Sequence, residues 1–85
     1  MRSFAVTVAT TATTIVPADN DTRTVYLHNE SGKSVYLGGS DVTTSNGYHL
    51  ANNETMSIVV PGGSSLQAVV GSGTGTLIVL RPSDA

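Results

Sequence analysis

The chain has 85 residues, of which 12 % are charged, and a formal net charge of −2; soluble domains usually contain roughly 25 % charged residues. This length accommodates a single domain. The four basic residues are scattered without a run or stripe, which argues against nucleic acid as a partner, and no stretch matches the roughly 18 apolar residues of a membrane helix.

The Thr-rich segment 3–16 is the first element of the chain. Phe4, Val6 and Val8 alternate with smaller residues, which predicts a β-strand that continues or restarts through residues 13–16. Pro17 ends it, because proline cannot donate to a strand ladder. The threonines interrupt the apolar core that a signal peptide needs, so we interpret the segment as part of the mature protein.

A repeated pattern follows, in which TVYL at 24–27 is echoed by SVYL at 34–37 across the turn-forming residues HNESGK. We expect an antiparallel hairpin with Gly32 at a positive φ. The side chains of Val25, Leu27, Val35 and Leu37 are then expected in the core.

The opposite face of this expected hairpin carries Tyr26, His28 and Tyr36. Two aromatic side chains on one sheet face can stack across strands or contact a sugar or a partner protein. Stacking is the simpler interpretation, and a contact surface comes second.

The rest of the chain alternates apolar runs with glycine-rich turns. Segment 38–50 bends at Gly38-Gly39 and again at Asn46-Gly47 before returning to apolar residues. GSGTG at 71–75 predicts a hairpin turn, and residues 83–85 a frayed tail. Three further strands are expected at 55–60, 66–70 and 77–80, the last of them central and buried on both faces.

Together these elements predict an all-β fold, a small single-domain β-sandwich or barrel of about six to eight short antiparallel strands. Residues 1–85 form one domain, with an N-terminal strand or arm at 3–16 and the sandwich or barrel at 20–82. One Phe, three Tyr, no Trp and no Cys leave a thin core without disulfides. We therefore expect stabilisation by partners or by self-association.

No motif assembles a catalytic, metal or cofactor site, so we predict no enzyme, no metal and no cofactor. A nucleotide loop would need a helix after GSGTG, where an apolar strand is expected. The tract DNDT at 19–22 lacks the glycine that a calcium loop requires. His28 and His49 have no acid at a convincing spacing, and a surface histidine is the simpler interpretation.

The remaining candidates are residues for contact with other proteins. The N-terminal segment and the bends of 38–50 present side chains without chemistry of their own. The candidate contact residues are Phe4, Val6, Val8, Tyr26, His28, Tyr36, Asp41 and Tyr48.

Four blocks of the chain, RTVYLHN, SVYLGGSDVTTSNGYHL, NNETMSIVV and SLQAVVGSGTGTLIVLRP, resemble a group of small β-rich proteins encoded in the structural modules of tailed bacteriophages. The resemblance covers residues 20–82. Asn53 departs from it, since the group more often has glycine there, but asparagine also tolerates positive φ. The matching positions are Arg23, Asn29, Gly38, Gly39, Val42, Thr43, Asn46, Gly47, Leu50 and Glu54.

The resemblance implies a virion structural protein on the capsid surface, most specifically a capsid decoration (cement) protein that binds and stabilises the assembled shell. Its partner would be the major capsid protein, and it would form a homo-oligomer, for which we expect a trimer. No nucleic acid or membrane is expected as a partner. The alternative is a glycan- or receptor-binding β module on a phage head or tail.

Overall fold

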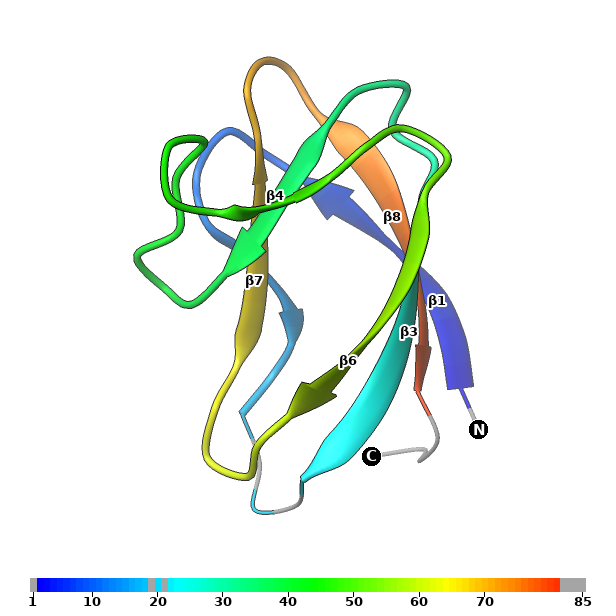
Figure 1. Ribbon diagram of the computed structural model, residues 1–85, viewed down its shortest axis with the longest axis vertical. Coiled ribbons are helices and arrows are strands. Elements are labelled where there is room, and N and C mark those ends of the chain that lie inside the picture. Colours follow the sequence, from blue (N-terminus) through cyan, green and yellow to red (C-terminus); the bar gives the residue numbers. More distant parts are fainter. Residues whose placement is uncertain (1, 19, 21, 82–85) are drawn as a thin grey trace.

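The computed structural model describes residues 2–18, 20 and 22–81, and within them the chain is all-β (Figure 1). The expected tail at 83–85 and the acids Asp19 and Asp21 of the polar tract lie outside the described residues. The strands are β1 (Arg2–Val8), β2 (Thr13–Val16), β3 (Arg23–Asn29), β4 (Val35–Gly38), β5 (Tyr48–Leu50), β6 (Thr55–Val60), β7 (Leu66–Val70) and β8 (Gly75–Arg81).

These strands form two four-stranded antiparallel sheets that pack face to face. Sheet A has the order β1-β8-β3-β6, and sheet B has the order β2-β7-β4-β5. The two layers are visible in Figure 1, with β3, β6 and β8 on one side and β4 and β7 on the other. The prediction of an all-β sandwich is confirmed.

The predicted hairpin of residues 24–27 and 34–37 is wrong. β3 pairs with β6 and β8 in sheet A, whereas β4 pairs with β5 and β7 in sheet B. Two strands that face each other across a sandwich show the same alternation as two strands in a hairpin, so the pattern alone cannot separate them. Gly32 does have a positive φ, of 77°.

The turn GSGTG is not a hairpin turn either, because it leads from β7 in sheet B to β8 in sheet A. Among consecutive strands, β4 and β5 form the single hairpin in the described part of the chain. Since almost every connection crosses between the layers, each sheet is assembled from strands distant in the sequence. The sandwich therefore depends on long-range contacts, which favour slow folding.

The core lies between the sheets and draws on each of the eight described strands. Val25 and Leu27 of β3 and Val35 and Leu37 of β4 are buried there, as the alternation predicts. The other members of the buried cluster are Val8, Ile15, Val16, Leu50, Val60, Leu66, Ala68, Val70, Leu77 and Val79.

Strand β8 is central in sheet A but is not buried on both faces. Its burial alternates, with Leu77 and Val79 buried and Ile78 and Leu80 half-buried on the outer side. A continuous apolar run shows that a strand is central, but it does not show whether anything covers the outer face.

The N-terminal segment 3–16 is part of both sheets. It provides β1 at the edge of sheet A and β2 at the edge of sheet B. Between the two strands, the C=O of Ala9 accepts a hydrogen bond of 3.0 Å from the N–H of Val70.

A buried asparagine joins the two sheets at one end of the sandwich. Asn29 is fully buried, and its Nδ2 donates to the carbonyls of Lys33 at 2.8 Å and Leu50 at 2.9 Å. Its Oδ1 accepts the N–H of Ser31 at 2.9 Å. Both amide hydrogens and the acceptor therefore have partners, and the end of β3 is linked to the end of β5.

The turn before β6 has the expected backbone. Asn53 has a φ of 66°, so the asparagine does adopt the left-handed conformation that the turn was expected to need. Glu54 closes the turn, because its Oε1 accepts the N–H of Ala51 at 2.6 Å.

Candidate functional site

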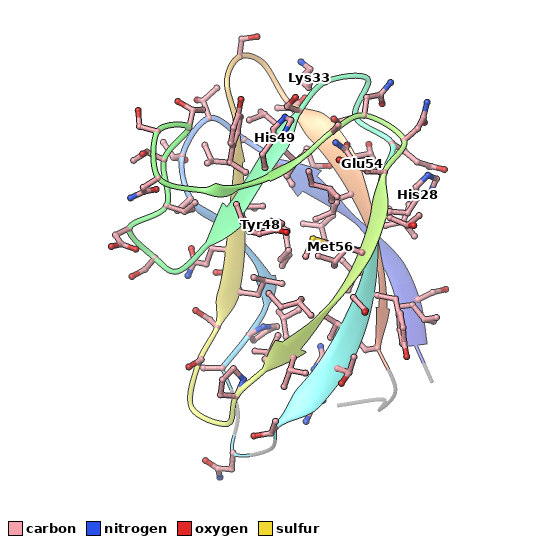
Figure 2. All side chains as sticks on the ribbon, viewed as in Figure 1. His28, Lys33, Tyr48, His49, Glu54 and Met56 are labelled. Atoms are coloured by element: carbon pink, nitrogen blue, oxygen red, sulfur yellow. The ribbon has the colours of Figure 1, made fainter. Side chains whose placement is uncertain are left out.

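Among the described residues, no three His, Cys, Asp or Glu side chains gather where they could hold a metal ion. The two histidines lie on different sheets, and Figure 2 shows His28 pointing away from the interior, well separated from His49. Nδ1 of His28 is 3.5 Å from Oε1 of Glu30, whereas Nε2 of His49 is 2.7 Å from Oγ of Ser34. The Ser34 hydroxyl and the His49 imidazole are thus within hydrogen-bond distance of each other, but this contact is exposed and does not line the hollow that the structure describes.

The described part of the chain also contains no helix that could span a membrane. The candidate sites are therefore sought on the surface of the sandwich. Sheet A and sheet B each have one outer face, and the two faces differ in how far their apolar side chains are covered.

The outer face of sheet A is built from rows of cross-strand neighbours. Tyr26 lies opposite Leu80 on one side and Ser57 on the other. Cross-strand partners point to the same side of a sheet, so the face can be followed from strand to strand. This surface, here called the open face, comprises Ser3, Ala5, Thr7, Thr24, Tyr26, His28, Thr55, Ser57, Val59, Thr76, Ile78 and Leu80.

A hollow of about 490 Å³ occupies part of the open face. Its apolar floor comes from Ile78 and Leu80 of the central strand β8, and Tyr26 stands beside it with 52 % of its surface exposed. The remaining lining residues are Leu27, His28, Thr55, Met56 and Ser57.

The chemistry of the open face is neutral. None of its twelve positions is Asp, Glu, Lys or Arg, and Ser and Thr surround an apolar centre. Apolar groups within a polar rim, without charges at the centre, are typical of surfaces that bind other macromolecules. Because no charge must be desolvated, docking here costs little in electrostatics.

The outer face of sheet B is closed by comparison. Val69 points outward from β7 beside Tyr36, yet only 3 % of its surface is exposed. The Tyr36 ring packs against His49, with 5.4 Å between the ring centroids. Tyr26 and Tyr36 therefore lie on opposite outer faces, and the expected stacking between them is wrong because their strands belong to different sheets.

The bend 39–47 beside sheet B is held by its own hydrogen bonds. Oδ1 of Asn46 accepts the N–H of Thr43 at 2.7 Å, and Nδ2 of Asn46 donates to the C=O of Asp41 at 3.2 Å. Val42 is buried beneath the loop with 6 % exposed. A Cβ at Gly47 would come within 2.5 Å of the Cβ of Tyr36, so this glycine is required for close packing.

Two of the expected contact residues lie next to this part of the molecule. Asp41 is exposed in the bend, and Tyr48 of β5 has 67 % of its surface exposed. They are available to a partner, but they do not belong to the open face.

The candidates of the N-terminal segment have different environments. Val8 is fully buried in the core, so its side chain is not available to a partner. Val6 is half-buried at the edge of the core, and Phe4 lies in β1 opposite Val79.

Several residues of the open face were missed from the sequence, namely Ile78, Leu80, Ser57 and Val59. Their alternation with core residues was visible in 55–60 and 75–81. What the sequence did not show is that β3, β6 and β8 are neighbours, and without that order these side chains do not form one surface.

Comparison of the chain with protein-family models, with curated proteins and with solved structures found no match.

Proposed function

We propose that this protein is a non-enzymatic virion protein of a tailed bacteriophage, a capsid decoration (cement) protein that docks onto the assembled shell through the open face of sheet A. One observation carries the docking role: sheet A presents a neutral face with an apolar hollow, whereas sheet B covers its own outer apolar residues. Such a face suits close contact with another protein better than it suits chemistry.

The assignment to phage virions rests on the resemblance of residues 20–82. The residues that carry the resemblance have backbone-shaping roles here. Asn29 joins the sheets, Gly47 admits Tyr36, and Glu54 closes the turn before β6. They support a shared fold, and the open face supplies the reason for a binding role.

The mechanism follows from mass action. A protein that binds the assembled shell but not the free major capsid subunits stabilises the shell by the free energy of its own binding. With many copies on a regular lattice, each contact can be weak while the total stabilisation is large. The neutral face fits this role, because its binding depends little on ionic strength.

The direct test adds the purified protein to phage particles that lack it. The matched variants are Tyr26→Ala and Ile78→Ser on the open face, with Tyr48→Ala, exposed elsewhere, as the control. We expect the wild type and Tyr48→Ala to co-sediment with particles and raise their resistance to heat, and the open-face variants to lose both effects. Particles that bind all four proteins equally, or none of them, would contradict the proposal.

A second candidate is a glycan-binding module on a phage head or tail, and one observation favours it. The exposed ring of Tyr26 stands beside His28 and Ser57 in the hollow, and sugars bind to aromatic faces flanked by hydrogen-bonding groups. Glycan-array binding that disappears in Tyr26→Ala would favour this function over shell binding. An array without signal, together with co-sedimentation, would exclude it.

A further inference from the structure

The edges of sheet A are longer and more regular than those of sheet B. β1 has seven residues and β6 has six, and both keep an unbroken register with their neighbours. In sheet B, β2 has four residues and a register shift, and β5 has only three residues. Short and bulged edge strands prevent pairing with other chains, so sheet B is protected and sheet A is not.

The backbone groups that face outward can be assigned on β6. The N–H of Asn29 donates to the C=O of Glu54, and the C=O of Asn29 accepts the N–H of Asn53. Antiparallel strands alternate between pairs that exchange both hydrogen bonds and pairs that exchange none. Thr55, Ser57 and Val59 therefore direct their N–H and C=O groups to the free edge.

The outward backbone groups of β1 follow from the same alternation along β8. The N–H of Glu30 donates to the C=O of Thr76, which places the alternate residues of β8, including Leu77, in hydrogen-bonded pairs with β1. The outward residues of β1 are then Ser3, Ala5 and Thr7. Neither edge has proline or lysine within its strand.

Apolar side chains are also incompletely covered at these two edges. The half-buried hydrophobic residues that pack against the core are Val6 of β1 and Met56 and Ile58 of β6. Figure 2 shows Met56 pointing into the space between the sheets. A strand added at either edge would cover this apolar surface and pair the free backbone groups.

We infer that β6 of one copy pairs with β1 of a second copy of this chain, so that sheet A continues from copy to copy. Within sheet A, successive strands are antiparallel from β1 through β8 and β3 to β6. β1 and β6 thus run in opposite directions, and a second copy in the same orientation presents its β1 antiparallel to β6. Both strands place apolar residues on the core side. On the outer side β1 has small or polar residues, whereas β6 has Thr55, Ser57 and the apolar Val59, which is 57 % exposed.

The small area of one edge contact favours a closed ring of copies in preference to a dimer. Seven residues span about 23 Å and two packed sheets are about 10 Å apart, so one edge covers on the order of 250 Å². Stable interfaces cover roughly 800 Å² on each partner, so one edge contact is weak. A closed head-to-tail ring uses both edges of every copy and leaves none exposed.

This inference does not depend on what the open face binds, because the edges and the face use different groups. The first measurement is sedimentation velocity of the wild-type protein over a concentration range up to about 1 mM, where an interaction of about 4 kcal/mol is half-saturated. We expect association that increases with concentration. A wild type that stays monomeric over the whole range would overturn the inference.

Two complementary variants then test the polarity of the contact. Ala5→Pro blocks β1 and Ser57→Pro blocks β6, and each removes an outward N–H without removing a bond of the intrachain ladder. We expect each variant alone to remain monomeric. Mixed in equal amounts, they should form a dimer that does not grow, because one unblocked β6 meets one unblocked β1.

Ala5→Ser and Ser57→Ala, which keep the N–H groups, are the matched controls and should associate as the wild type does. A dimer formed by either proline variant alone would show like-with-like pairing and overturn the head-to-tail contact, as would a mixture that stays monomeric. Circular dichroism of dilute protein verifies folding. If a proline variant does not fold, Ala5→Lys or Ser57→Lys replaces it, since edge lysines also oppose strand pairing.

Discussion

Sheets A and B have the same number of strands and the same antiparallel pairing. They differ in how well their outer apolar side chains are covered and in how regular their edge strands are. Sheet B covers its outward Val69, packs Tyr36 against His49, and ends in short or shifted edge strands. Sheet A leaves an apolar hollow on its outer face and regular strands at both edges. Sheet B therefore covers its own outer face, and we propose that contacts outside the chain cover the outer face and the edges of sheet A.

We expect the largest loss of stability from a substitution of Asn29, which links the two sheets. Asn29→Ala removes three hydrogen bonds and leaves the N–H of Ser31 and the C=O of Leu50 without that partner, whereas the C=O of Lys33 still accepts from Oγ of Ser31. Each group left unsatisfied costs about 1–3 kcal/mol, so we expect unfolding to become easier by about 3 kcal/mol or more. Urea titration measures the change.

Asn46→Ala is the matched control for this substitution, since Asn46 also bonds the backbone through its side chain but is exposed. We expect it to cost about 1 kcal/mol. Equal losses for the two variants would show that burial of Asn29 between the sheets has no special importance.

The second largest loss of stability is expected at Gly47, which packs closely against Tyr36 beside sheet B. A Cβ at position 47 would lie 2.5 Å from the Cβ of Tyr36 and 2.9 Å from the C=O of Thr43. We expect Gly47→Ala to destabilise the fold by about 2 kcal/mol, in the range of overpacked cores. Gly39→Ala is the control, because its Cβ would meet only Oδ1 of Asp41 at 3.5 Å, and it should melt close to the wild type.

Apolar residues on the two outer faces should respond differently to the same change. Val69→Ser in the covered face should cost about 2 kcal/mol, because a nearly fully buried Val is replaced. Ile78→Ser in the open face should cost about half as much, since Ile78 is only half-buried. Denaturation midpoints with unchanged slopes measure both, and a larger loss for Ile78→Ser would contradict the division into a closed and an open face.

The smallest difference is expected for the two tyrosines. Tyr36→Ala loses the contact with His49 and should cost about 1 kcal/mol. Tyr26→Ala removes a ring that is 52 % exposed and should stay within about 0.5 kcal/mol of the wild type. Thermal melts measure the loss of stability in both variants. A larger loss for Tyr26→Ala than for Tyr36→Ala would contradict the assignment of the better-covered tyrosine to sheet B.

Much of the fold could be predicted from alternation and turn chemistry. Met56, Ile58 and Val60 face the same way, and Asn53 has the positive φ that its turn requires. These properties are local, so neighbouring residues determine them. The side chain of Asn29 could not be assigned its role in this way, because Leu50 is distant in the sequence.

The order of the strands within each sheet could not be predicted from local sequence patterns. The alternation of Val25 and Leu27 with Tyr26 is the same whether β3 pairs with β4 or faces it across the core. The open face depends on that order, since it brings Tyr26, Ser57 and Leu80 together from three strands. The grouping of these three side chains into one surface therefore could not be predicted from local patterns.

The central claim is that sheet A makes the contacts with other molecules through its open face and its edges. Hydrogen exchange and side-chain footprinting of the protein, free and bound to phage particles, test this claim most directly. We expect bound protein to gain protection at Tyr26, Ile78 and Leu80 and at the edge amides of β1 and β6, with little change at Tyr36 and His49. Protection confined to sheet B and the bend 39–47, with sheet A unchanged, would contradict the account.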